Sequence, residues 1–448
     1  MKRFEDSMTS PNNKHPDWAE SLYERLAEDD EGRVCKDISD EACQETPGNF
    51  LYTLIANTLS SLADKLASAK TTLPWLLLHL GGPSWMLSLL VPIRESGSML
   101  PQMLIGALVR RQAIRKWVWV WGGGLQGSCL LLMGWVALVL EGALAGYSLL
   151  GLLILFSLAR GACSVAFKDV QGKTIPKTRR GRLGGWISAL SGGVTLAIGL
   201  LLGMLQNQDS SWFYAGLLLL ASACWFLAAL VFSRIVEFPG ATEGGANGLT
   251  EAFKKLNLLK DDRLFRKFVV ARALAMGSGL AAPFYLALAR DDLGGALVLL
   301  GLFIAVEGLA GLISSPIWGR WADQSSRKVF SNASALAGGL SLLVALVSLL
   351  SLPSSLTWGL YLLCFLGLGI AHAGVRLGRK TYMVDMAGGN KRTDYVAVSN
   401  SVIGALLLLT GLLGALTALF SVQATLILLG SAGLASALIS RNWKEVSG

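Results

Sequence analysis

Apolar runs of about 20 residues recur along the chain, from near residue 50 to near residue 440. A run of this length crosses about 30 Å of hydrocarbon as an α-helix. Of the 448 residues, 53% are hydrophobic and 15% are charged, whereas soluble domains usually carry about 25% charged residues. The runs lack the alternation of a membrane-spanning barrel. We therefore predict an all-α polytopic membrane protein surrounded by a lipid bilayer.

Twelve transmembrane helices are expected. They are placed at about 49–71, 84–109, 116–140, 143–167, 183–206, 211–233, 265–289, 295–318, 328–350, 356–376, 395–419 and 422–440. The first is the weakest because Asp64, Lys65 and Lys70 lie in its second half. An amphipathic helix resting on the membrane surface is the alternative for this segment.

Polar segments divide the apolar region into parts. Residues 1–46 hold 13 acidic and 6 basic side chains, a composition that cannot bury a core. The expected parts are an acidic, disordered cytoplasmic leader at 1–48, a six-helix bundle at 49–233, a cytoplasmic linker at 234–264, a second six-helix bundle at 265–441 and a cytoplasmic tail at 442–448.

The loops on the two sides of the membrane differ in charge. Four alternate loops hold 17 Lys and Arg residues, whereas the opposite loops hold only Arg290. Basic loops remain on the cytoplasmic side, so both termini are expected there. The opposite loops also lack Asn-x-Ser/Thr acceptors for glycosylation, which favours a bacterial inner membrane.

The two halves of the chain repeat. The segment SPIWGRWADQSSRK at the end of predicted helix eight corresponds to IGALVRRQAIRK at the end of helix two, and Gly319 and Gly106 in these segments are offset by 213 residues. Such repeats are typical of transporters whose site lies between the halves. GRWADQSSRK, residues 319–328, resembles the G-x-x-x-D-x-x-x-R-K loop signature of the major facilitator superfamily. KTIPKTRRGRLGG, residues 173–185, is similar to that superfamily's loop between helices four and five.

The resemblance covers about residues 49–440 and implies a fold and a function. The implied fold has 12 transmembrane helices in two pseudo-symmetric six-helix bundles, and the implied function is that of a permease-type secondary transporter. The resemblance also implies that helices one, four, seven and ten line a central cavity. Charged or ionisable residues on those helices are Asp64, Lys65, Arg160, Arg272, His372 and Arg376.

Altered charges in the signature loops suggest a conformational latch. Arg110 stands where the family's first-half loop has Asp. In the resembled family these loops help to close the outward-facing state against helices five and eleven. The hypothetical latch consists of Arg110, Arg180, Asp323, Arg327, Lys328, Asp385 and Asp394, with Asp323 near Arg180 or Arg182 and Arg110 near Asp385 or Asp394. The alternative is that these are solvated loop charges that only set topology.

Charged residues also stand inside the apolar runs, where each is expensive unless it meets water or a partner. Arg94 and Glu307 are related by the same 213-residue offset, and each lies about 18 Å from the cytoplasmic end of its helix. We expect Glu95 and Glu307 to couple transport to protons. The alternative is a permanent Arg94–Glu307 ion pair that does not titrate.

Two further arginines indicate the charge of a solute. Arg160 and Arg376 favour an anionic substrate, because Arg presents a planar fork to carboxylate or phosphate. Their alternative role is as gate charges that reach water at the loops. The complete set of substrate and coupling candidates is Asp64, Arg94, Glu95, Arg160, Glu307, His372 and Arg376.

Several classes of protein are disfavoured. The chain has no GxxxxGK[ST] loop and no catalytic or metal-ligand spacing, so we expect no enzyme, cofactor, metal or nucleic-acid partner. We expect a monomeric secondary transporter that moves a small anionic or zwitterionic solute by alternating access, coupled to protons. The alternative is a non-transporting sensor or assembly factor of the same fold, with the acidic leader docking a partner.

Overall fold

The computed structural model is helical wherever it describes the chain. It describes residues 23, 25–26, 38–100, 108–109, 111–204, 210–240, 257–294, 297–350, 352–386, 391–417 and 421–446. Every regular element among these residues is a helix, which confirms the predicted all-α class. Most of the predicted leader and the middle of the predicted linker lie outside the described residues.

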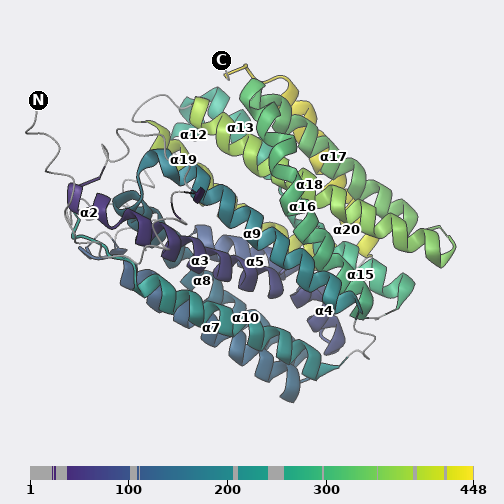
Figure 1. The fold of residues 1–448 in the computed structure, drawn as a ribbon. Helices are drawn as coiled ribbons and strands as arrows, with labels where there is room; N and C mark the ends of the chain where they lie inside the picture. Colours follow the sequence, from purple (N-terminus) through teal and green to yellow (C-terminus); the bar gives the residue numbers. More distant parts are fainter. Residues whose placement is uncertain are drawn as a thin grey trace, which may run out of the picture.

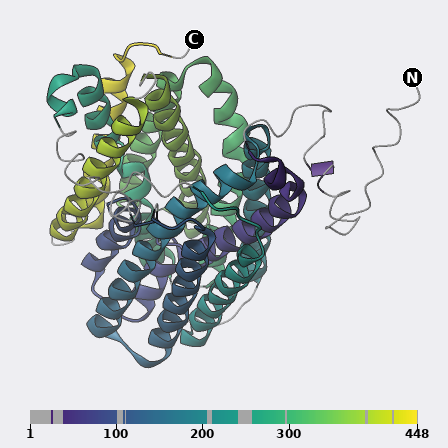
Figure 2. The same ribbon diagram turned by 90° about the vertical axis from the view of Figure 1, so that its left-hand side faces the viewer.

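The helices form two groups that follow the order of the chain (Figures 1 and 2). The first group consists of α2 (Asp40–Gln44), α3 (Thr46–Leu66), α4 (Thr72–His79), η1 (Ser84–Met86), α5 (Leu87–Met99), α7 (Lys116–Val139), α8 (Gly142–Thr174), α9 (Lys177–Met204) and α10 (Ser211–Ser233). The second consists of α12 (Leu258–Asp261), α13 (Arg263–Leu274), α14 (Gly277–Leu280), α15 (Ala282–Leu293), α16 (Leu297–Gln324), α17 (Ser326–Val347), α18 (Ser354–Met386), α19 (Lys391–Thr417) and α20 (Val422–Arg441).

Nine helical stretches among the described residues are long and apolar enough to cross a membrane. They correspond to predicted helices three to ten and twelve. Predicted helix one is divided into α3 and α4, and helix two is described without interruption only as far as Leu100. The apolar part of α19 is limited to Val398–Leu412.

The first helix of each half is interrupted, which corrects the prediction of continuous helices at 49–71 and 265–289. In the first half, α3 ends at Leu66, and the Ser68 hydroxyl accepts the Lys70 N–H at 3.1 Å before α4 begins. Pro74 is tolerated in the first turn of α4 because the N–H groups there have no helical partner. In the second half, the Gly-rich α14 separates α13 from α15.

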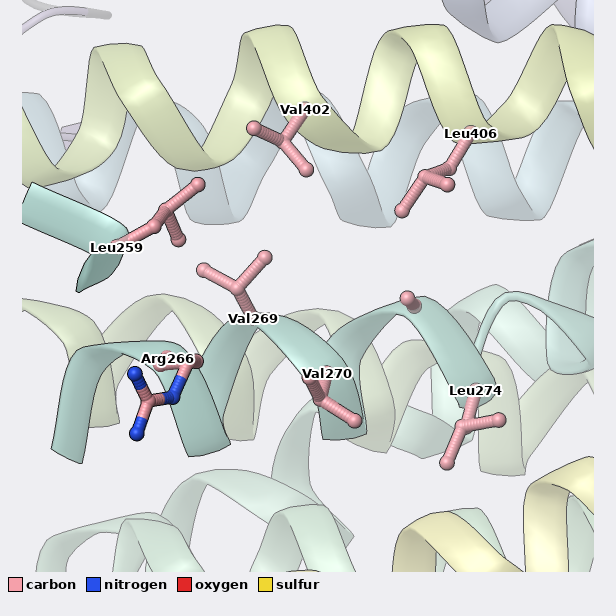
Figure 3. Close-up of a pocket in the computed structure, with 8 residues that line it drawn as sticks. Leu259, Arg266, Val269, Val270, Leu274, Val402 and Leu406 are labelled. Atoms are coloured by element: carbon pink, nitrogen blue, oxygen red, sulfur yellow. The ribbon is translucent and has the colours of Figure 1, made fainter. Parts of the chain in front are cut away.

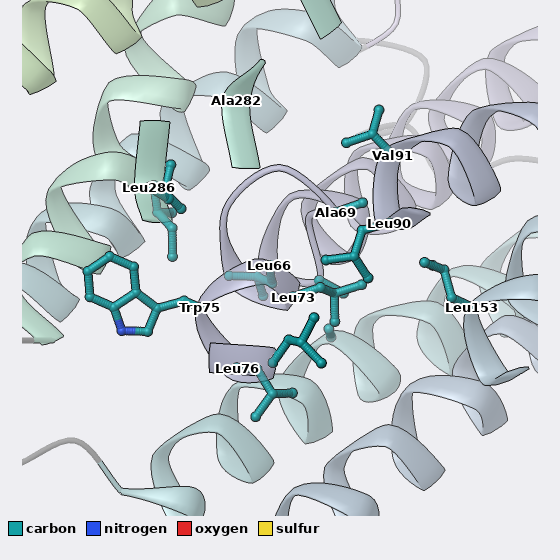
Figure 4. Packing of buried hydrophobic residues seen from close by; sticks show 14 of the residues in the cluster. Leu66, Ala69, Leu73, Trp75, Leu76, Leu90, Val91, Leu153, Ala282 and Leu286 are labelled. Carbon is teal, nitrogen blue, oxygen red and sulfur yellow. The ribbon is translucent and has the colours of Figure 1, made fainter. Parts of the chain in front are cut away.

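Helices α4 and α15 close one end of the space between the bundles. Trp75 of α4 and Leu286 of α15 are fully buried in one apolar cluster, which Figure 4 shows from close by. Arg290 of α15 donates to the Trp75 carbonyl oxygen at 3.0 Å, and its guanidinium lies 5.3 Å from the centre of the indole ring. These contacts join the two halves at this end.

Two helix pairs form the long interface between the bundles, α9 with α16 and α5 with α19. A Cβ atom at Gly199 or Gly308 would overlap the backbone of the facing helix, so these glycines allow α9 and α16 to pack closely. Along the other pair, the hydroxyls of Ser88 and Ser96 each donate to a carbonyl oxygen of α19 at 2.9 Å.

Candidate functional site between the bundles

Asp64, near the end of α3, is held by two arginines of its own bundle. Its Oδ2 atom lies 3.2 Å from Nη2 of Arg94 on α5 and 3.0 Å from Nη2 of Arg160 on α8. The Arg94 guanidinium lies 4.9 Å from the centre of the Phe156 ring, and that of Arg160 lies 5.5 Å from a Trp225 ring. The carboxylate and the aromatic faces together position both guanidinium groups.

The next residue along α3 connects the two bundles. Lys65 Nζ lies 2.9 Å from Oε1 of Glu307 on α16, and the Thr71 hydroxyl donates to Oε2 of the same carboxylate at 3.4 Å. Arg94 is paired with Asp64 instead, so the Arg94–Glu307 ion pair considered from the sequence is not formed. The interruption after α3 thus brings a lysine and a threonine of one half to a carboxylate of the other.

Glu95 faces a second group of cations. Its carboxylate interacts electrostatically with four cations: Lys70 in the break after α3, the adjacent Arg94, and Arg376 and Arg379 on α18. Among the described residues, the side chains of Glu95, Lys70, Arg376 and Arg379 form no hydrogen bond or ion pair with one another or elsewhere. The sequence reasoning did not select Lys70 or Arg379. Pro74, in the first turn of α4, is the sequence signal for the break in which Lys70 lies.

Helix α18 presents different side chains on different faces. His372 Nδ1 lies 3.2 Å from the Ser278 hydroxyl of α14, and the imidazole occupies the space that a Cβ at Gly279 would fill. Arg376, one turn further along α18, is exposed. His372 therefore packs within the second bundle, whereas Arg376 is accessible to a solute.

Arg272 forms its hydrogen bonds within the second bundle. Its guanidinium donates to the Ser399 hydroxyl at 2.5 Å and to Oδ1 of Asn400 at 2.8 Å, both on α19. The arginine is buried and connects α13 to α19. It does not reach the first bundle through any of these contacts.

Two members of the predicted latch have partners that the hypothesis did not name. Arg180 donates to the carbonyl oxygens of Gly172 and Ile175 at 2.9 Å, so it covers the end of α8. Arg327 Nε lies 3.2 Å from Oε2 of Glu445, which follows α20. In these positions each arginine stabilises a helix end within its own bundle.

The rest of the latch stays a prediction. Lys328 and Asp385 are exposed at the ends of α17 and α18. Arg110 and the side chains of Asp323 and Asp394 lie outside the described residues.

Glu237, which follows α10, is a buried acid that the sequence reasoning did not select. It accepts the backbone N–H of Lys116 at 2.6 Å and that of Arg115 at 2.9 Å, and Lys173 Nζ lies 2.7 Å from its Oε1. It thus neutralises the start of α7, where a helix dipole favours an anion. Glu445 lies in the same way beside the start of α17, so the two halves repeat this feature.

An apolar groove of about 370 Å³ lies apart from the charged residues, between α13 and α19 (Figure 3). Its lining residues are Leu259, Arg266, Val269, Val270, Ala273, Leu274, Val402 and Leu406. Only one of them is charged, so the groove is poorly suited to a polar solute. The candidate site is therefore the charged region between the bundles.

The charged region is suited to binding an ionic solute. Its side chains come from the interrupted first helix of the first half and from α5, α8, α16 and α18, so both bundles contribute, as at transporter sites. Among the described residues, no three His, Cys, Asp or Glu side chains are grouped as metal ligands would be. The fold and the site define a multi-pass membrane protein of two helical bundles with ion pairs between and beside them.

Comparisons with known proteins show what the chain resembles. Residues 268–445 match the sequence model of the Major Facilitator Superfamily. The inward-open xylose transporter XylE from E. coli has a TM-score of 0.64 at 12% identity, covering 89% of this chain and 97% of that chain. The nucleoside transporter NupG has a TM-score of 0.63 at 14% identity, covering 87% and 99%. A POT family transporter in complex with 5-aminolevulinic acid has a TM-score of 0.63 at 14% identity, covering 87% and 94%.

The chain has the major facilitator fold, and its second half carries that family's sequence pattern. These findings confirm the resemblance seen in the signature loop. At identities this low, the solved structures establish the shared fold alone. No curated protein sequence matches the chain.

Proposed function

We propose that the protein is a proton-coupled secondary transporter that moves a small anionic or zwitterionic solute by alternating access. The observation that carries the proposal is the position of Asp64, 3.2 Å from Arg94 and 3.0 Å from Arg160, beside the break in α3. The basic loops favour both termini in the cytoplasm, and the lack of glycosylation acceptors in the opposite loops favours an inner membrane. The proposed bundles are residues 49–233 and 265–441.

The shared carboxylate supplies a mechanism for coupling. While Asp64 is ionised, it occupies both guanidinium groups. A substrate anion that takes these groups adds negative charge beside Asp64 and removes its cationic partners, so the carboxyl group binds a proton. Solute and proton therefore bind together, and each increases the affinity for the other.

The ion pair between the bundles supplies a mechanism for alternation. The contacts of α4 and α15 close one end, and the Lys65–Glu307 pair is a second contact between the bundles. Rocking of one bundle against the other must separate these groups before that end can open. The pair therefore favours the state in which the α4 and α15 end is closed.

Transport by purified protein in liposomes tests the proposal. Solutes of anionic, zwitterionic, cationic and neutral classes are added with and without a pH gradient, and the current on a solid-supported membrane is recorded. We expect a solute-evoked current that the pH gradient drives and that Asp64→Asn abolishes. Asp169→Asn, which removes a carboxylate near the end of α8 that lies 3.1 Å from Arg115, is the matched control and should retain the current.

A second function is favoured by the packing of part of the leader. Tyr23 is buried against Phe50 at a ring distance of 5.3 Å, and the Trp186 indole donates to the Leu26 carbonyl oxygen at 3.1 Å. A leader docked on α3 and α9 suits a sensor that exchanges this contact for a partner. Removal of residues 1–38 should then abolish function while Asp64→Asn leaves it intact, the opposite of the transporter's behaviour.

A further inference from the structure

Cations outnumber acids in the region between the bundles. The described residues that contribute are the basic Lys65, Lys70, Arg94, Arg160, Arg376 and Arg379 and the acidic Asp64, Glu95 and Glu307. A surplus of positive charge between the bundles attracts an anion to this region. The positions of the unpaired cations therefore indicate what kind of anion binds.

Asp64 and Glu307 are already engaged in ion pairs, and unpaired cations are left at two places. Glu307 is paired with Lys65, and Asp64 is shared by two arginines, so one positive charge remains beside Asp64. Glu95 is a single charge facing the cations of the break and of α18. A second positive excess therefore lies around Lys70 and Arg376.

We infer that the solute is a small organic dianion with its two acidic groups at opposite ends, of the dicarboxylate type. One carboxylate binds Arg94 and Arg160 of the first bundle, and the other binds Lys70 and Arg376 where the break after α3 approaches the second bundle. This inference rests on the proposed function and narrows its substrate class.

The chemistry of the two places supports two separate carboxylates. At the first, the Arg160 and Arg94 guanidinium groups already bind a carboxylate, that of Asp64, and a substrate carboxylate replaces it with the same geometry. At the second, Arg376 is exposed and has no hydrogen bond or ion pair among the described residues, so it is available to a solute. A ligand held from both bundles binds more tightly when they approach each other, as alternating access requires.

The same charges argue against a zwitterion. An ammonium group would need a carboxylate that is free of cations. Asp64 and Glu307 have ion-pair partners, and Glu95 interacts electrostatically with four basic side chains from the two bundles. An ammonium placed at either position would meet Lys70, Arg376 or the arginines of the first bundle.

A matched series of solutes tests the inference on the full-length protein in liposomes. The series consists of glutarate, its monoamide, its diamide, 4-aminobutyrate, glycerol phosphate and glucose, with the dicarboxylates from malonate to adipate to find the best spacing. We expect the best dicarboxylate to give half-maximal current at a concentration at least tenfold below that of the monoamide. The diamide, 4-aminobutyrate and glucose should give none.

Variants of α18 test where the second carboxylate binds. Arg376→Gln should raise the half-maximal concentration for the dicarboxylate at least tenfold and leave that for the monoamide within a factor of two. Arg376→Lys should be intermediate, and Lys380→Gln, at an exposed position of the same helix, should be unchanged. Thermal unfolding of each purified variant establishes that it is folded.

The outcomes separate the inference from the proposed function. Best transport of the monoamide, 4-aminobutyrate or glucose overturns the dianion inference and leaves secondary transport intact. Best transport of a phosphate monoester such as glycerol phosphate overturns the assignment of two separated groups. Silence of the folded protein towards every class of solute overturns both the inference and the proposed function.

Discussion

The two bundles hold their central acids in different ways. In the first bundle, Asp64 is neutralised by two arginines of the same bundle. In the second, Glu307 is neutralised by Lys65 of the other bundle. When an acid has partners in its own bundle, a solute can take those partners and the acid can bind a proton without movement of the bundles. When the partner lies in the other bundle, the environment of the acid changes only when the bundles move. We therefore assign the coupling of solute and proton binding to Asp64, and the change between the two open states of the transporter to Glu307.

The largest effect is expected at Arg160. Arg160→Gln removes one of the two guanidinium groups that hold Asp64 and the solute, and a charge-assisted contact of this kind contributes about 1.5–3 kcal/mol. We expect transport to fall by about 100-fold, measured as initial uptake into liposomes. Lys168→Gln, at an exposed position further along α8, is the matched control and should behave as the unaltered protein. Near-normal uptake by the folded Arg160 variant would contradict the role of the first acid.

Charge exchange tests the pair between the bundles. Lys65→Glu and Glu307→Lys each place like charges at the interface and should lower transport about tenfold, since each destabilises the closed α4 and α15 end. The double variant restores attraction and should recover most of the activity. A double variant as inactive as either single one would show that the pair does more than join the bundles.

The acids that follow the last helix of each bundle, Glu237 and Glu445, allow a smaller comparison, this time of stability. The Glu237 side chain is 0% exposed and that of Glu445 is 38% exposed. Glu237→Gln leaves Lys173 and the start of α7 without an anion and should lower the free energy of unfolding by about 2–3 kcal/mol. Glu445→Gln should lower it by less than about 1 kcal/mol, because exposed ion pairs contribute little. Thermal unfolding of the two purified variants measures the two losses of stability. Equal losses would contradict the difference expected between the buried and the exposed acid.

The smallest effect is expected at Tyr395, at the start of α19. Its hydroxyl donates to Oδ2 of Asp262 at 2.6 Å, and this hydrogen bond together with burial raises the pKa of Tyr395 to about 12. The phenol thus stabilises the fold fully below its unfolded value of 10.0, and this contribution is lost only as the pH rises towards about 12. Between pH 6 and 9, Tyr395→Phe should lower stability by about 1 kcal/mol at every pH. A shift that varies across this range would contradict the assignment.

The sequence predicted the architecture well because lipid imposes one requirement on every span. Length and polarity placed predicted helix six at the bounds of α10, 211–233, and most other spans within a few residues. Helices α8 and α18 continue beyond their predicted ends at 167 and 376, since a helix can extend from the bilayer into water with charged residues on its surface. Periodicity and hydropathy do not detect where such a helix stops.

The sequence predicted several residues of the candidate site, but it did not predict which of them form ion pairs. Embedded charge identified Asp64, Arg94 and Arg160, but their pairing depends on how α3, α5 and α8 pack. Lys70 and Arg379 were missed because they stand near predicted helix ends, where charges are ordinary. Only the break after α3 and the continuation of α18 bring them to Glu95.

The most direct test of the central claim compares two modes of transport in one variant. In Asp64→Asn, the carboxyl group that exchanges a proton for an arginine partner is lost, while both arginines remain to bind the solute. We predict that liposomes with this variant exchange labelled for unlabelled solute at a rate within about threefold of the unaltered protein, but that a pH gradient no longer drives accumulation. Accumulation that still follows the pH gradient in this variant would contradict the account.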